Sequence, residues 1–164
     1  MYSTTELSDR FIVGGTALRY ESGSGPAWEI IAERILCIGE ATSESGAGDE
    51  DWDICFVTDE HGAWLEGSLH AQGRNDALQW LSVRLDCSLE VKLANAPAFR
   101  SRVMWPRSVL DRPLFQYQVA PWRRLFSRSL RRLGCAPLGA VQTVHPEVIE
   151  TLWRLNRSAA SRSA

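Results

Sequence analysis

The side chains best suited to bind a partner are concentrated in residues 121–133, near the C-terminal end of the sequence. Two aromatic and five arginine residues form this candidate binding set: Trp122, Arg123, Arg124, Phe126, Arg128, Arg131 and Arg132. The aromatic residues and the nearby leucines recur at helical spacing on one face, and the arginines lie off that face. Such a helix can enter the groove of a partner protein or lie on an anionic membrane. It can equally dock on its own domain, because any docked helix needs an apolar face.

Two groups of residues suggest metal sites, but neither has the spacing of a known site. Four acidic residues fall at positions 1, 3, 5 and 12 of a loop like that of an EF-hand: Asp49, Asp51, Asp53 and Glu60. Position 6 requires a glycine for the sharp turn, and here it is Ile54. A zinc site would have to combine four scattered residues: Cys55, His61, His70 and Cys87. We therefore expect no bound metal, and we interpret the acidic stretch as a solvated turn.

The sequence contains no short motif of nucleophilic catalysis or nucleotide binding. It lacks G-x-S-x-G, the P-loop pattern and G-x-G-x-x-G, so no cofactor is expected. Among the histidines, His70 is the one that we consider as an acid or base, together with nearby Asp or Glu side chains. A small enzyme with a non-local active site stays an alternative, because residues brought together from distant positions leave no local motif.

Charge is divided between the two parts of the chain. Residues 1–99 hold 17 of the 20 acidic and 6 of the 18 basic residues, which gives a formal charge of −11; residues 100–164 carry +9. This asymmetry indicates a charged partner or attraction between the two parts. The acidic part would repel nucleic acid, and the expected helix after Pro146 has few groups to contact base edges. Nucleic acid is therefore not expected as a partner.

The N-terminal two thirds of the sequence is mostly β-strand by pattern. A strand with a glycine bend is expected over 11–20, another strand over 28–39, and a hairpin over 52–70 that turns at Gly62. A short helix over 28–34 is the alternative for part of the second segment. Three further short strands are indicated by apolar alternation or β-branched and aromatic content, over 89–93, 102–105 and 114–117.

Three helices are expected. The leucines of residues 76–86 recur at helical spacing, with Asn75 as the expected N-cap. Pro121 and Gly134 bound the basic helix, and Pro146 begins a second C-terminal helix with an apolar face. The last residues are small and polar, and we expect them to be disordered.

This order of elements predicts an α+β fold: a mainly antiparallel sheet with one packed helix, followed by a C-terminal pair of helices. The order resembles that of pleckstrin-homology-like domains, a resemblance of element order that involves no motif. We expect an acidic α+β domain over 1–119, a basic helical extension over 120–156 that packs on the same domain, and a disordered tail over 157–164.

The sequence also predicts location and a class of function. No signal peptide pattern or long apolar stretch is visible, so a cytoplasmic protein is expected. The cysteines are expected to be small buried apolar residues. The leading hypothesis is a non-catalytic interaction or adaptor module that binds a protein partner, or a second copy of itself, through the candidate binding set. An enzyme, an anionic membrane surface as partner, and a purely structural role for residues 121–155 are the alternatives.

Overall fold

The computed structural model of this chain describes residues 8–23, 25–42, 52–59, 61–97, 99–118 and 141–160. Within these residues the chain forms antiparallel sheets and two α-helices, α1 (Arg74–Arg84) and α3 (Pro146–Ala160). The expected α+β class with a mainly antiparallel sheet is therefore confirmed. The basic helix expected over 121–133 lies outside the described residues.

The first three strands form a small antiparallel sheet of their own. β1 (Arg10–Gly14), β2 (Ala17–Glu21) and β3 (Trp28–Ile31) pair in chain order. Gly15 makes the turn between β1 and β2 with φ +49°, a conformation that glycine adopts without strain. The glycine bend expected over 11–20 is thus a hairpin turn.

The central sheet has four strands in the order β6-β5-β4-β7. Its strands are β4 (Cys37–Thr42), β5 (Trp52–Val57), β6 (Trp64–Ser68) and β7 (Ser101–Trp105). The hairpin expected over 52–70 is confirmed as β5 and β6, and Gly62 has φ +82° in the connection. All six residues of β4 are buried, so this strand is covered on both faces.

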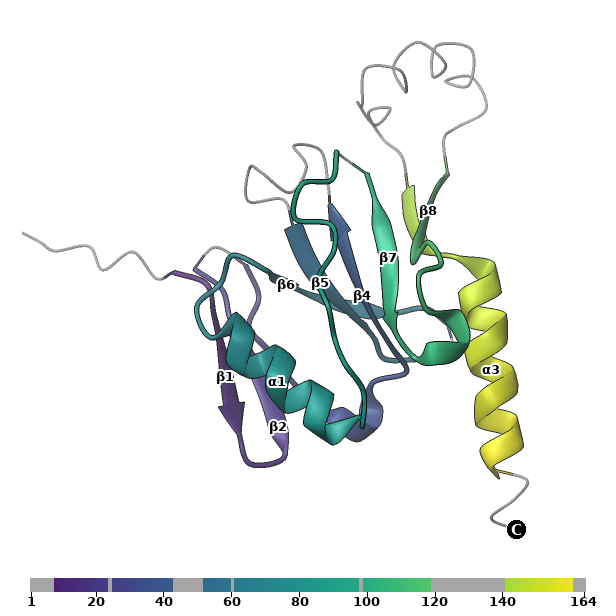
Figure 1. The fold of residues 1–164 in the computed structure, drawn as a ribbon, viewed down its shortest axis with the longest axis horizontal. Helices are drawn as coiled ribbons and strands as arrows, with labels where there is room; N and C mark the ends of the chain where they lie inside the picture. The colour runs from purple at the N-terminus through teal and green to yellow at the C-terminus, as the bar shows by residue number, and fades with distance from the viewer. Residues whose placement is uncertain are drawn as a thin grey trace, which may run out of the picture.

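Alternation along β5 divides the core into two clusters, one on each face of the central sheet. Trp52, Ile54 and Phe56 belong to the first cluster, whereas Cys55 and Val57 belong to the second. Successive side chains of a strand point to opposite faces, so a single strand serves both clusters. Figure 1 shows the layers that cover the two faces, with β1, β2 and α1 on one side and α3 on the other.

The small sheet and α1 cover the first face. Phe11, Tyr20 and Leu81 are buried in this cluster. The small sheet approaches β6 closely, because a Cβ atom on Gly67 would lie 2.6 Å from Cζ of Phe11. A glycine is therefore required at this position for the two sheets to pack.

The second face is covered by β8 (Phe115–Gln118), β9 (Val141–Val144) and α3. Val144, Val148 and Leu152 are buried there. The helix expected from Pro146 is confirmed, and it continues to Ala160, four residues into the segment that we expected to be a disordered tail. Strand β9 was not expected from the sequence. Strand β9 pairs with β8, and helix α3 contributes Val148 and Leu152 to the second core cluster. Residues 141–160 are therefore part of the same packed body.

Two other sequence expectations differ from the structure near β3 and α1. The single strand expected over 28–39 is broken by a 3-10 turn, η1 (Ala32–Arg34), which lets β3 join the small sheet and β4 the central one. Helix α1 begins at Arg74, and Gly73, not Asn75, is its N-cap. Gly73 has φ +73°, and a Cβ atom there would lie 2.4 Å from the carbonyl oxygen of Phe11. This close crossing of β1 fixes where the helix starts.

Candidate functional site

The candidate binding set of residues 121–133 lies outside the described residues, so the structure gives no geometry for it: Trp122, Arg123, Arg124, Phe126, Arg128, Arg131 and Arg132. Its two flanks are described. Gln118 at the end of β8 pairs with Val141 at the start of β9. The residues on either side of this basic segment are therefore neighbours in one antiparallel hairpin.

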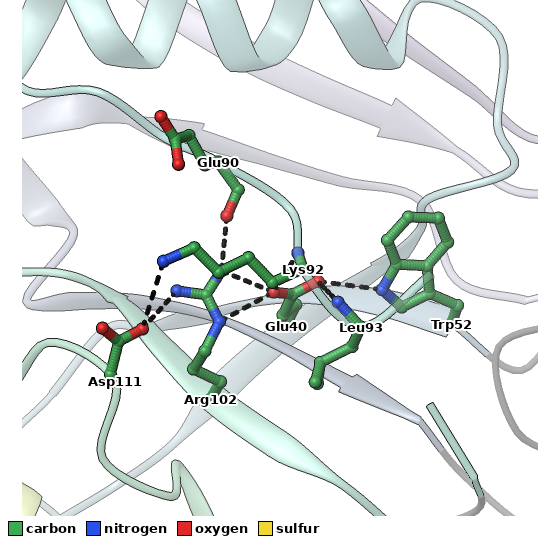
Figure 2. A network of polar contacts seen from close by, with 7 residues as sticks. All are labelled: Glu40, Trp52, Glu90, Lys92, Leu93, Arg102 and Asp111. Carbon is green, nitrogen blue, oxygen red and sulfur yellow. Dashed lines mark hydrogen bonds and ion pairs between the residues drawn. The ribbon is translucent and has the colours of Figure 1, made fainter. Parts of the chain in front are cut away.

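The described residues contain two polar clusters that sequence reasoning did not find. The first surrounds Glu40 of β4, and Figure 2 shows its seven residues: Glu40, Trp52, Glu90, Lys92, Leu93, Arg102 and Asp111. We call it the Glu40 cluster. Glu40 is fully buried on the face of the central sheet that carries the first apolar cluster. A carboxylate in this position is stable only if its charge is paired and its oxygens are hydrogen-bonded.

The Glu40 carboxylate accepts hydrogen bonds from three elements. Arg102 of β7 donates from Nε at 3.0 Å and from a terminal nitrogen at 2.6 Å, and Trp52 donates from Nε1 at 3.1 Å. The backbone N–H groups of Lys92 and Leu93 donate at 2.8 and 3.1 Å. These two N–H groups are therefore used by a side chain, which explains why residues 89–93 do not form the expected strand.

Arg102 uses the rest of its guanidinium to hold the neighbouring loops. It donates to Asp111 at 2.8 Å and to the carbonyl oxygen of Glu90. The hydrogen bond from Arg102 keeps the pKa of the Asp111 carboxyl below its ordinary value. Lys92 is a second cation near Asp111, with its Nζ atom 3.8 Å from the carboxylate. The Glu40 cluster thus ties β4, β7 and the segment around residue 90 together, and its chemistry is structural.

The second polar cluster lies in a groove of about 1130 Å³ along β6, which is an edge strand of the central sheet. We call it the β6 groove. All five residues of β6 line it, Trp64 and Glu66 among them, together with two aromatic residues, two acidic residues and one histidine from other segments: Tyr20, Trp28, Asp9, Asp53 and His70. Its described lining contains no lysine or arginine. The groove is therefore acidic, with aromatic walls.

Two side chains of the small sheet contact the outer edge of β6. The backbone N–H of Ser68 donates to the Tyr20 hydroxyl at 3.1 Å, and the Trp28 indole donates to the carbonyl oxygen of Glu66 at 2.7 Å. Backbone groups of alternate residues in an antiparallel pair point away from the partner strand. Trp64, Glu66 and Ser68 are alternate residues of β6, so the N–H and C=O groups of Trp64 also point away from β5 and into the groove.

Asp9 fixes the Tyr20 hydroxyl at one end of the groove. The hydroxyl donates to the Asp9 carboxylate at 2.6 Å, and this hydrogen bond keeps the pKa of Asp9 below its ordinary value. Burial of the phenol, together with its hydrogen bond to Asp9, raises the pKa of Tyr20 to about 12. Tyr20 is therefore a neutral hydrogen-bonding group at physiological pH and is not prepared to act as a base.

The residues considered for catalysis or metal binding are placed in different surroundings. His70 lines the groove, with its ring 5.8 Å from that of Trp52, and His61 lies exposed in the turn before β6. Burial raises the pKa of the Cys37 thiol to about 12 and also raises that of Cys55. Both thiols are thus protonated and buried, as expected, whereas Cys87 is only partly buried. In the described ranges, no three His, Cys, Asp or Glu residues are grouped to hold a metal ion.

The acidic stretch considered for calcium is described only in part. Asp53 and Ile54 lie within β5, and Ile54 is buried in the first apolar cluster. A strand at this point does not wrap around an ion. The remaining acidic positions, Asp49, Asp51 and Glu60, lie outside the described residues.

Comparison with known proteins gives no relative. No protein-family model, curated protein or solved structure matches this chain. The resemblance in element order to pleckstrin-homology-like domains is therefore not confirmed by a structural neighbour. A search of the described helices for one long and apolar enough to cross a membrane finds none.

Proposed function

We propose that this protein is a non-catalytic interaction module that binds a protein partner through residues 121–133. The partner would be contacted by Trp122 and Phe126 and attracted by the arginines of the candidate binding set. The alternative partners are a second copy of this chain and an anionic membrane.

The observation that carries the proposal is the register of β8 and β9. Gln118 pairs with Val141, and four register pairs hold the hairpin together. Phe115 and Val144 anchor its base in the second core cluster. The residues that precede and follow the basic segment are therefore paired on one hairpin of the body, and segments that a rigid scaffold presents between such elements commonly carry binding residues.

Three ionisable groups of the described residues, those of Glu40, Cys37 and Cys55, are buried and serve the fold. The Glu40 carboxylate is used by five donors, and the thiols of Cys37 and Cys55 are protonated inside the core. Groups used in this way stabilise the fold and are not available to a substrate.

The first experiment replaces residues 119–140 with an Asn-Gly turn. Because Gln118 and Val141 are a register pair, a two-residue turn fits between them. We expect the variant to fold, because the core residues of β8, β9 and α3 are all retained. We also expect it to lose binding to the partner protein. The measurement is affinity capture followed by binding of the purified captured protein. A folded variant that binds this protein as well as the full chain does would contradict the proposal.

A charge-reversal pair separates the contribution of the arginines from that of the segment as a whole. The double variant Arg124→Glu and Arg128→Glu is expected to weaken binding at least about tenfold, by about 1.4 kcal/mol, with an unchanged circular dichroism spectrum. The matched control is Arg100→Glu with Arg107→Glu, two exposed arginines of the same basic part. Equal losses in both variants would indicate a general charge effect. Binding to phosphatidylglycerol vesicles that the first variant alone loses, with no protein captured, would identify a membrane as the partner instead.

A further inference from the structure

We propose that the β6 groove is a second binding surface and that it takes an extended, basic segment of a partner protein. The described residues that line this surface do not include residues 121–133, and the proposal does not depend on the function proposed for them. The argument uses the edge position of β6, the charge of the groove lining and the aromatic residues at its walls.

The edge of β6 is only partly covered. The Ser68 N–H donates a hydrogen bond to the Tyr20 hydroxyl, and the Glu66 carbonyl oxygen accepts one from the Trp28 indole. The N–H and C=O groups of Trp64 and the N–H of Glu66 point to the same side and pair with no other described residue. An extended peptide can form main-chain hydrogen bonds with such an edge. The covered end at Ser68 limits the pairing to the first half of the strand, which fixes where the peptide lies.

The negative charge of the groove favours a basic peptide. Asp9, Asp53 and Glu66 contribute three carboxylates, and no lysine or arginine lies among the described residues that line the groove. Glu66 is exposed and is itself in the part of β6 that is free to pair. A peptide with arginine or lysine side chains would be attracted to this surface, whereas an acidic peptide would be repelled.

The aromatic residues favour an arginine-containing peptide in particular. Trp28 and Trp64 have their indole N–H groups hydrogen-bonded to Glu66, at 2.7 Å to its carbonyl oxygen and 2.6 Å to its carboxylate. Trp28 packs against the first core cluster and Trp64 against the second, so it is the Trp64 ring that is held beside the Glu66 carboxylate. An arginine side chain that pairs with this carboxylate would lie beside an aromatic ring, an arrangement that stabilises guanidinium groups. The groove volume of about 1130 Å³ also exceeds that of most small-molecule pockets and fits a peptide.

The test uses the full chain and three synthetic peptides of equal length. The first is (Arg-Val)₃, which is basic and favours an extended conformation. The second is the same peptide with every backbone amide nitrogen methylated, which keeps the charge but removes the main-chain donors on both edges of the peptide. The third is (Glu-Val)₃. Binding is measured by isothermal titration calorimetry, and the site is located from the amide NMR signals of Trp64 and Glu66.

The proposal expects binding of (Arg-Val)₃, with at least about tenfold weaker binding of the methylated peptide, equivalent to the loss of one or two hydrogen bonds. Glu66→Lys is expected to weaken binding at least about tenfold, and Glu150→Lys, on the exposed face of α3, less than about twofold. Equal binding of the methylated peptide, equal effects of the two lysine variants, or NMR shifts outside β6 would overturn it. A tenfold gain in affinity when the Asn-Gly turn replaces residues 119–140 would also overturn it, because this chain's own basic segment would then be the occupant.

Discussion

The Glu40 cluster and the β6 groove belong to the same central sheet, but their polar groups are used in different ways. In the Glu40 cluster, the buried charges of Glu40 and Arg102 meet on a covered face of the sheet, and both oxygens of the carboxylate have donors within the chain. In the groove, Asp9 and Tyr20 bond to each other, while Glu66 and the backbone groups of Trp64 face outward. The difference follows from position, because β4 is covered on both faces and β6 is an edge strand.

This comparison separates polar residues that hold the fold from those that are open to a partner. A buried charge without its counter-charge is expensive, so the Glu40 cluster tolerates little change. A polar group at an open edge can exchange its protein partner for water at small cost. The predictions that follow test this contrast by measuring how much stability each region loses.

The largest effect is expected for Arg102→Met. This substitution leaves the Glu40 carboxylate buried without its cation and should reduce the free energy of unfolding by about 3–5 kcal/mol. Arg112→Met is the matched control, because Arg112 is half exposed and lies 3.6 Å from Glu147 at the surface. Urea denaturation measures both. A loss below about 1 kcal/mol for Arg102→Met would mean that the Glu40 cluster does not hold the fold.

A smaller effect is expected for Tyr20→Phe in the groove. The variant keeps the ring in the first core cluster and removes the hydroxyl that bonds Asp9 and the Ser68 N–H. Because water can reach both groups from the groove, we expect a loss of about 1 kcal/mol by the same urea measurement. A loss as large as that of Arg102→Met would remove the distinction between the two regions.

The raised pKa of Tyr20 predicts that the protein loses stability at alkaline pH. The folded-state pKa of Tyr20 is raised to about 12, above the value of about 10 for an unfolded chain. The stability that comes from this shift is fully present below about pH 10 and is lost as the pH rises through the folded value. Ultraviolet absorbance of the phenolate should show one tyrosine titrating late, and Tyr20→Phe should remove this component. Titration of every tyrosine near pH 10 would contradict the prediction.

The smallest effect is expected for Arg154→Ala on α3. Arg154 pairs with Glu150 one turn earlier, and both side chains are mostly exposed. Surface pairs at this spacing contribute about 0.3–0.5 kcal/mol, so the loss should not exceed about 0.5 kcal/mol. This variant provides the surface baseline against which the two polar regions are compared. A loss above about 1 kcal/mol would show that exposed pairs in this chain cannot serve as that baseline.

Several elements were predictable from the sequence because their signals are local. The β5–β6 hairpin follows from alternating apolar residues on either side of Gly62, and α3 follows from Pro146 and an apolar stripe. The α+β class follows from the order of these elements. By contrast, β9 is only four residues long, and it is a strand because β8 lies beside it.

The two polar regions were decided by the tertiary structure. Glu40 and Arg102 are 62 positions apart in sequence, and no pattern near either residue predicts that the two side chains pair. The one available signal was an acidic residue at the end of an apolar strand, where a buried charge needs a partner. The groove is assembled from β6 and several distant segments, so it has no local pattern at all. Sequence alternation determines which face a side chain occupies, but only the folded backbone determines which charges meet and which strand edge stays open.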